Sequence, residues 1–413
     1  MPTPPVPPQA DAGRGVAASD DAVFGGFTDA SAAAPDAVAW QSQPAGGLGA
    51  KPAHDASDRD ASDSLLGVAA PVRDAGDGVG VGAMQAGSAA QAGDPAQPSD
   101  AVRSNDAVQS KAARPRTGTI VACGVLGAAF LALAALAYAK GVLTDAGQGY
   151  DTMVWWTLSS QVPFTKILSG AFHASAVVLG VAGVAAAASL AIAAARRRMG
   201  LVIQLVAFAA VVLVVAGVAK THLPRPVFNL NRPNPANSAP SGHTLLFTAA
   251  MLALMLAVPR AWRAWVALIG WLANSAIGLA LVAGQWHRPS DVVMSVFIAG
   301  AVACMALAFT RGSGMDRIVN RKPSAAVQIV APALVMLGVM ALGYSLYGIW
   351  QLLPNLADEP TWGMSIACES AVSAIVGSNA LVAGVVCALR QLTASPLSGA
   401  GIFGTPPRPP KAG

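Results

Sequence analysis

Two residues four positions apart, His287 and Asp291, are the first candidates for chemistry in this chain of 413 residues. On a helix this spacing separates them by about one turn, so the carboxylate can accept a hydrogen bond from one ring nitrogen of the histidine. Such a bond fixes the tautomer and leaves the other ring nitrogen as a nucleophile. The motif alone is also compatible with an interfacial histidine followed by an aspartate that the helix dipole favours.

A second group of residues, Pro240-Ser241-Gly242-His243, comes directly before an apolar run. Ser241 can cap a helix, and Gly242 lets backbone N–H groups approach a ligand closely. Because a helix N-terminus favours anions, this segment is suited to a phosphate, with His243 in the first turn beside it. Taken alone, the group also fits an ordinary helix cap with an incidental histidine.

Basic residues near these groups are candidates for binding a phosphate. Lys220 and Arg225 lie between two apolar runs, and an arginine can hold a phosphate through a bidentate fork. Arg288 is a third candidate, although on a helix its side chain would point about 100° away from that of His287. The alternative is that these are loop charges beside lipid head groups. The remaining histidines are predicted to be bystanders: His54, His173 and His222.

The composition indicates the class of protein in which these candidate residues are held. Of all residues 54% are hydrophobic and 11% are charged, against about 25% charged in an average soluble domain. This excludes a typical soluble enzyme for most of the chain, and it excludes full disorder. The net charge of +5 combines an acidic N-terminal part with a basic remainder. The bases flank apolar runs, where they set membrane orientation and do not indicate nucleic acid.

Apolar runs of about 19–28 residues can each cross roughly 30 Å of hydrocarbon as a helix. The sequence therefore predicts an all-α, polytopic membrane helical bundle. We expect a six-span catalytic core over 117–312, followed over 313–390 by a cytoplasmic loop and two additional transmembrane helices. The predicted spans are 118–139, 167–195, 201–219, 242–259, 264–285, 291–310, 326–351 and 364–389.

The two ends of the chain have a different composition. Residues 1–116 are dominated by Ala, Asp, Gly, Pro, Ser and Gln, with few aromatic residues. Such a segment cannot bury enough apolar surface to offset its ordering entropy, so we expect a disordered cytoplasmic tail. Residues 391–413 are predicted to be a second, short disordered tail.

Arginine and lysine residues flank alternate ends of the predicted spans, which places those ends and both termini in the cytoplasm of a multi-pass cell-membrane protein. The opposite, extracytoplasmic face then receives the loops that carry the candidate residues. Ionisable residues near the middle of the spans are scarce, which argues against ion-coupled transport. The extracytoplasmic loops are predicted to be 140–166, 220–241, 286–290 and 352–363.

Together, these residues resemble three signatures of the type 2 phosphatidic acid phosphatases, a family of membrane lipid phosphatases related to vanadium haloperoxidases. The second signature, Pro-Ser-Gly-His, is matched by 240–243. In the third signature His287 and Asp291 match, and in the first Lys220 matches. The resemblance is strongest over about 200–310 and does not cover the N-terminal tail or the last two spans.

Two positions depart from the signatures. The Ser-Arg of the third signature falls on Ala280 and Leu281, and the Arg-Pro of the first falls on Val227 and Phe228. Both family arginines are thus missing at their expected positions. The candidates to replace them are Arg225, which comes two residues early, Arg288 and Arg232.

The resemblance implies a mechanism without a metal or another cofactor. His287 attacks phosphorus to form a phosphohistidine, Asp291 orients it, and His243 protonates the leaving oxygen. The implied substrate is a lipid phosphate in contact with membrane lipids, such as a polyprenyl pyrophosphate or phosphatidic acid; oligomeric state stays open. The residues implied to bind phosphate are Lys220, Arg225, Arg288 and the backbone of Ser241 and Gly242.

Two alternatives remain open on the sequence. The missing arginines favour a non-catalytic membrane protein that binds a lipid phosphate without turning it over. A lipid phosphotransferase on the same scaffold fits the signatures as well as a hydrolase does. Against binding alone, the residues that would do covalent and proton-transfer chemistry are all present: His243, His287 and Asp291.

Overall fold

The computed structural model describes residues 115–172, 175–228, 237–315, 325–358 and 361–394. Over these residues the secondary structure is helical and contains no strand. Most of the two predicted disordered tails lies outside the described residues. The C-terminal tail was expected from residue 391, but the last helix continues to Ala394, because Gln391 and Thr393 are buried against the bundle.

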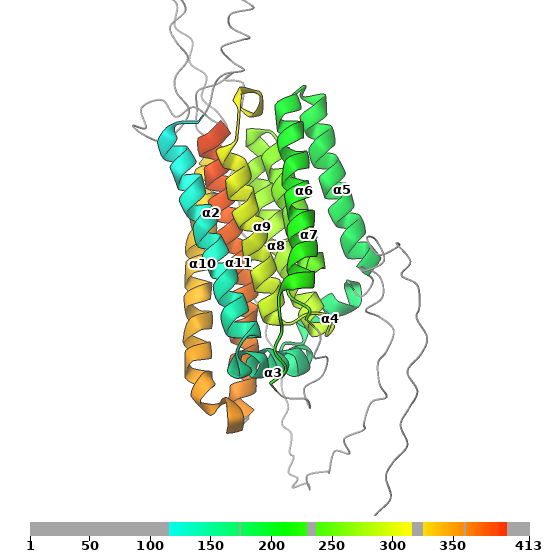
Figure 1. The fold of residues 1–413 in the computed structure, drawn as a ribbon, viewed down its shortest axis with the longest axis vertical. Helices are drawn as coiled ribbons and strands as arrows, with labels where there is room; N and C mark the ends of the chain where they lie inside the picture. The colour runs from blue at the N-terminus through cyan, green and yellow to red at the C-terminus, as the bar shows by residue number, and fades with distance from the viewer. Residues whose placement is uncertain (1–114, 173–174, 229–236, 316–324, 359–360, 395–413) are drawn as a thin grey trace, which may run out of the picture. The chain divides into compact units, whose positions relative to one another are not determined.

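Seven helices of the described residues are long and apolar enough to cross a membrane, so the chain is an all-α polytopic membrane protein. They run alongside one another in Figure 1. They are α2 (Thr117–Ala137, continued by the π-helix η2, Tyr138–Val142), α5 (Ser175–Ala195), α6 (Met199–His222), α8 (Arg263–Ala283, preceded by the 3-10 helix η3, Arg260–Trp262), α9 (Pro289–Ala308), α10 (Ala325–Leu352) and α11 (Thr361–Ala394).

The fourth predicted span is a shorter helix, α7 (Gly242–Ala257), of 16 residues. At 1.5 Å per residue it rises about 24 Å, less than the roughly 30 Å of a hydrocarbon core. Most of α7 is buried, and it contacts α5, α6, α8 and α9. At its C-terminal end the Arg196 guanidinium donates a hydrogen bond of 2.8 Å to the carbonyl of Ala257. This bond holds that end of α7 among basic residues.

The segment 140–166, which we expected to be a loop, contains two helices instead: α3 (Asp145–Gln161) and the start of α4 (Phe164–Ala171). Both lie at one end of the bundle in Figure 1. Thr144 caps α3 by accepting a hydrogen bond of 3.0 Å from the N–H of Gly147. The buried residues Tyr150, Val154 and Leu158 recur every four positions, which gives α3 one apolar face.

The second predicted span also begins later than expected. The sequence predicts it over 167–195, whereas the long helix α5 starts at Ser175, and α4 ends at Ala171. Helix α4 packs on α8 and exposes Phe164 and Ile167. The apolar run from 167 is therefore shared between two helices.

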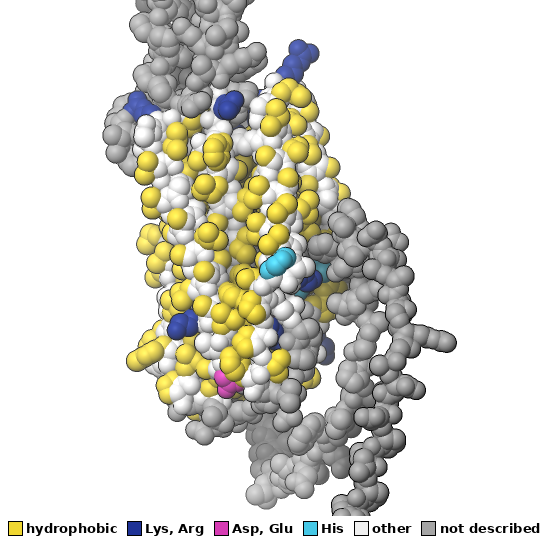
Figure 2. All heavy atoms as spheres, viewed as in Figure 1, with side chains coloured by type: hydrophobic (Ala, Val, Ile, Leu, Met, Phe, Trp, Pro, Cys, Tyr) yellow, Lys and Arg dark blue, Asp and Glu magenta, His cyan; other side chains and the backbone are white. Residues whose placement is uncertain are grey.

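The helices divide into an inner and an outer set. Helices α7 and α11 each contact α8 and α9, whereas α2, α5, α6 and α10 leave most of their apolar side chains uncovered. The face shown in Figure 2 is covered mainly by hydrophobic side chains. Within the C-terminal hairpin, α10 packs chiefly on α11, and α11 in turn contacts α3, α8 and α9. The last helix is thus part of the inner set.

Close contact between α10 and α11 depends on glycine. A Cβ atom built on Gly338 would lie 2.6 Å from the backbone nitrogen of Leu381, so no side chain fits there without moving α11. On the same helix, a Cβ atom on Gly343 would meet no atom within 4 Å. Small residues at one face thereby allow two membrane helices to approach each other.

We expect Gly338→Ala to destabilise the protein by about 1–3 kcal/mol, because the added methyl group overpacks a backbone contact. Thermal unfolding in detergent, followed by circular dichroism, measures the change. The matched control is Gly343→Ala on the open face of α10, which should be neutral or stabilising since alanine favours helix over glycine. Equal losses in both variants would contradict the close-packing explanation.

Candidate active site

The site is built where the N-terminal ends of two inner helices meet. Ser241 precedes α7, and Asp291 lies in the first turn of α9. The N–H of Ser241 donates to the carbonyl of Asp291 at 3.3 Å, and the hydroxyl of Ser295 donates to the carbonyl of Ser241 at 3.0 Å. These bonds fix two residues distant in sequence side by side, with His243 and His287 next to them.

His287 faces the Asp291 carboxylate through its Nδ1 atom. The distance from Nδ1 to Oδ2 is 3.8 Å, which is longer than a hydrogen bond but within reach of an ion pair. Both residues are buried. The same Oδ2 accepts a hydrogen bond of 2.6 Å from the Ser238 hydroxyl and one of 3.1 Å from the N–H of Arg288. The carboxylate is thus held in place, and Nε2 is the ring nitrogen of His287 turned away from it.

The imidazole of His243 lies next to that of His287. Their ring centroids are 6.1 Å apart, and the Trp286 ring lies 5.8 Å from that of His243. Among the described residues, the buried Nε2 of His243 has no hydrogen-bond partner. Two imidazoles at this separation can act on opposite sides of one small group, such as a phosphoryl group.

Arg288 is closer to this site than the sequence suggests. A helix would turn its side chain away from His287, but Arg288 precedes α9 and has an extended backbone, with φ −91° and ψ 157°. The helical angle therefore does not apply. Its Nη1 donates to the Ser238 hydroxyl at 3.2 Å, the same hydroxyl that donates to Asp291.

The other two predicted cations in the described residues are Lys220 and Arg225, which come from the end of α6 and the segment after it. Lys220, at the exposed end of α6, is near enough for its charge to act on His243. Arg225 is half-buried, and its buried Nη1 has no hydrogen-bond partner among the described residues. Its segment is fixed by Gln148, whose side-chain amide donates to the carbonyl of Pro226 at 2.8 Å. Arg232 lies outside the described residues.

The two backbone positions predicted to hold phosphate differ from each other. The N–H of Ser241 already donates to Asp291, so it is used inside the protein and does not face a ligand. The side chain of Ser241 accepts a bond of 3.0 Å from the Thr244 hydroxyl, as part of the helix cap. The N–H groups of Gly242 and His243 belong to the first turn of α7, for which an α-helix has no partner of its own.

An acidic residue that the sequence did not point to, Asp151, supports the site from α3. The buried carboxylate of Asp151 accepts a hydrogen bond of 3.3 Å from the N–H of Ser290 and another from its hydroxyl. Ser290 lies between the two predicted catalytic residues. Reading 145–161 as a helix would have found Asp151, because it shares a face with the buried Val154 and Leu158.

Burial raises the pKa of Asp151 to about 7, and the negative charge of Asp291 raises it too. The hydrogen bonds from Ser290 and the positive charge of Arg288 act in the opposite direction. In the described residues, the site included, no cluster of three or more His, Cys, Asp or Glu side chains is arranged to hold a metal ion.

The fold and this arrangement define a class: a polytopic helical membrane protein whose paired helix ends carry two histidines and an aspartate. Residues 200–315 match the model of the PAP2 superfamily, which confirms the resemblance inferred from the three signatures. The matched stretch includes His243, His287 and Asp291, and it supports a phosphatase-type function in a membrane. No curated protein and no solved structure compared with the chain matches it.

The raised pKa of Asp151 predicts a pH-dependent stability difference between the wild type and Asp151→Asn. A carboxyl group whose pKa is raised on folding stabilises the native state when protonated, and this contribution is lost as pH rises from about 4 to about 7. The asparagine variant lacks that loss, so its stability relative to the wild type should increase from pH about 5 to about 7.5. Thermal unfolding over this range measures it, and a constant or decreasing difference would contradict the assignment.

Proposed function

We propose that the protein is an integral-membrane lipid phosphatase that hydrolyses a phosphomonoester or pyrophosphate of a lipid. The observation that carries the proposal is the meeting of His243 with the His287–Asp291 pair at two helix N-termini, within the segment similar to the PAP2 superfamily. Helix N-termini attract phosphate, and a histidine oriented by a carboxylate is suited to attack it.

In the proposed first step, Nε2 of His287 attacks phosphorus while the bond from phosphorus to the lipid oxygen breaks. Nδ1 of His287 faces Asp291, so the carboxylate stabilises the positive charge that forms on the ring. His243 donates a proton to the leaving oxygen. The products of this step are a phosphohistidine and a lipid alcohol, or a lipid monophosphate where the substrate is a pyrophosphate.

In the second step His243, now neutral, takes a proton from water, and the resulting hydroxide attacks phosphorus. The phosphorus–nitrogen bond breaks, which restores His287 and releases inorganic phosphate. Negative charge on the phosphoryl oxygens is stabilised by the free N–H groups of Gly242 and His243 and by nearby cations. We assign that cationic role to Lys220, Arg225 and Arg288.

We further propose a location and an organisation for this activity. The basic residues that flank alternate helix ends favour a cell-membrane protein with cytoplasmic termini and an extracytoplasmic site. A lipid then presents its head group from the outer leaflet. The six spans over 117–312 supply the reacting groups, and α11 contributes packing through its contacts with α8 and α9.

Release of phosphate from a panel of lipid phosphates by the purified protein tests the proposal. We expect wild-type activity on at least one lipid and a loss of about 10³-fold or more in His287→Ala, because the nucleophile is removed. The matched control is His222→Ala, which changes an exposed histidine at the end of α6. Its activity should equal that of the wild type.

Other outcomes of this experiment would contradict the proposal. Binding of phosphate or vanadate by a folded protein that releases no phosphate from any lipid would favour the binding-only alternative. Consumption of the lipid phosphate only when an acceptor lipid is present would favour a phosphotransferase. Activity that survives in His287→Ala would exclude the phosphohistidine route.

His243→Asn separates the two steps. With para-nitrophenyl phosphate, whose leaving group departs without a proton, the first step should proceed while attack by water is slow. We therefore expect a burst of nitrophenolate equal to about one per active site, with accumulation of an acid-labile phosphoenzyme. Rapid-mixing absorbance measures the burst. Slow linear release without phosphoenzyme would assign His243 to the first step alone.

A further inference from the structure

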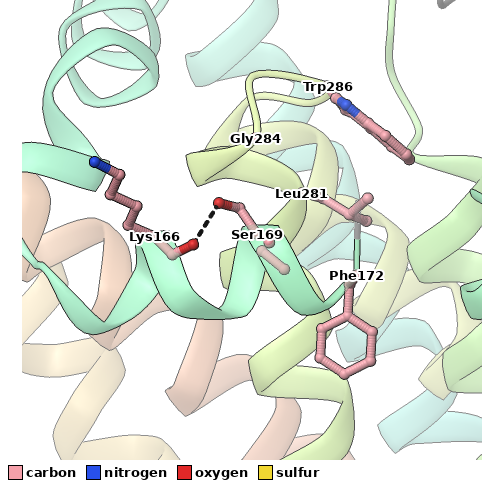
Figure 3. A pocket seen from close by; sticks show the side chains of 8 residues that line it. Lys166, Ser169, Phe172, Leu281, Gly284 and Trp286 are labelled. Atoms are coloured by element: carbon pink, nitrogen blue, oxygen red, sulfur yellow. Dashed lines mark hydrogen bonds between the residues drawn. The ribbon is translucent and has the colours of Figure 1, made fainter. Parts of the chain in front are cut away.

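A cavity of about 300 Å³ opens between α4 and α8, beside the candidate active site. Its walls include Gly170 from α4 and Phe172 directly after it, Leu281 from α8 and Gly284 directly after it, and Trp286. In Figure 3 Phe172, Leu281 and Trp286 lie at one side, whereas the Lys166 amine points away at the other. The cavity is thus apolar where it is nearest to Trp286.

The cavity is linked to the reacting residues through one side chain, that of Trp286. Trp286 lines it and also lies 5.8 Å from the His243 ring. Leu281, another lining residue, occupies the position at which the third signature has an arginine. Where the resemblance implies a phosphate-binding charge, this chain therefore has a buried aliphatic side chain. This wall offers an anion neither a positive charge nor a hydrogen bond, whereas a hydrocarbon group can pack against it.

The surroundings of Phe172 and the outer side of α4 are apolar. Phe172 packs against a buried cluster formed by side chains of α5, α7 and α8, among them Val178, Phe247 and Ile277. Helix α4 exposes Phe164 and Ile167 on its outer side. The Phe172 wall of the cavity is thus backed by apolar side chains, and α4 carries exposed apolar side chains nearby.

We propose that this cavity binds the first carbon atoms of the lipid substrate's hydrocarbon chain, next to the phosphate ester. The inference rests on the proposed function and names the part of the substrate that the site recognises besides phosphate. A lipid whose phosphate lies between the histidines would otherwise expose these carbons to polar surroundings. The cavity instead offers them apolar walls next to the site, and its volume lies near the lower end of ligand pockets, about 300–1,000 Å³.

Filling the cavity tests this proposal. Gly170 lines it, and a Cβ atom on Gly170 would meet nothing within 4 Å, so Gly170→Leu adds a bulky apolar side chain at the cavity wall without a clash at Cβ. We expect kcat/KM for hexadecyl phosphate to fall at least tenfold and kcat/KM for methyl phosphate to stay within twofold of wild type. The matched control is Gly180→Leu on α5, which also meets nothing within 4 Å but lies outside the cavity. It should affect neither substrate.

A labelling measurement covers the case in which the leucine variant folds poorly. Gly170→Cys in the His287→Ala background should react with a maleimide, and hexadecyl phosphate should slow the reaction at least fivefold while methyl phosphate does not. Ser160→Cys, at an exposed position on α3, is the control and should be unaffected. The native cysteines are all buried and give little background: Cys123, Cys304, Cys368 and Cys387.

Three results would overturn the inference. An equal loss of activity on both phosphates in Gly170→Leu would make the cavity part of a general phosphate site. An unchanged kcat/KM for hexadecyl phosphate, with no protection of Gly170→Cys, would leave the cavity without a role in substrate binding. A loss on methyl phosphate in Lys166→Met would make it an anion site. Absence of hydrolysis by the wild type would instead count against the proposed function, while the labelling test still decides about the cavity.

Discussion

The candidate site depends on the contact between the beginnings of α7 and α9. Ser241 donates its backbone N–H to Asp291 and accepts a hydrogen bond from the hydroxyl of Ser295. Two helix dipoles thereby point their positive ends at the same region, which is unfavourable unless negative charge is present. The Asp291 carboxylate supplies that charge inside the protein, and an anionic ligand can supply more. The contact that orients the histidines therefore also makes it favourable to bind an anion between these helix ends.

Other elements secure this contact from outside. The carboxylate of Asp151 on α3 receives the N–H of Ser290, and the turn before α9 is therefore anchored from two sides. The π-helix η2 also approaches closely, since a Cβ atom on Gly141 would lie 2.5 Å from the Cβ of Ser290. The segment between α2 and α5 is consequently a support for the site and not a simple connection.

Much of the fold followed from the sequence because apolar length is a strong signal. The ends of the long helices fell within a few residues of their predicted positions, apart from the start at Ser175. The helix α3 was missed because its residues are too polar for a span, although Tyr150, Val154 and Leu158 repeat every four positions. Length and hydropathy do not detect such a helix, whereas its periodicity does.

The candidate catalytic residues could be found from their spacing in the sequence, but the residues that hold them in place could not. His287 and Asp291 are neighbours in sequence, so their proximity could be inferred. Asp151 and Ser238 reach the same turn from positions 139 and 53 residues away in the chain, through contacts that only the fold creates. For Arg288 the expected direction of the side chain was wrong, because a helical angle was applied to a residue whose backbone is extended.

The short length of α7 has a consequence for electrostatics. Arg196 fixes one end of the helix among basic residues, and about 24 Å of helix reaches less far than roughly 30 Å of hydrocarbon. In the proposed membrane orientation, in which the C-terminal end of α7 lies at the cytoplasmic surface, the N-terminal end falls short of the opposite surface, where mobile ions and bulk water screen charge. In such surroundings the attraction between a helix end and a phosphate is stronger than in water and responds weakly to ionic strength. A ligand reaching this depth has to shed its hydration, which an amphiphile already partly buried in the bilayer does more readily than a soluble ester.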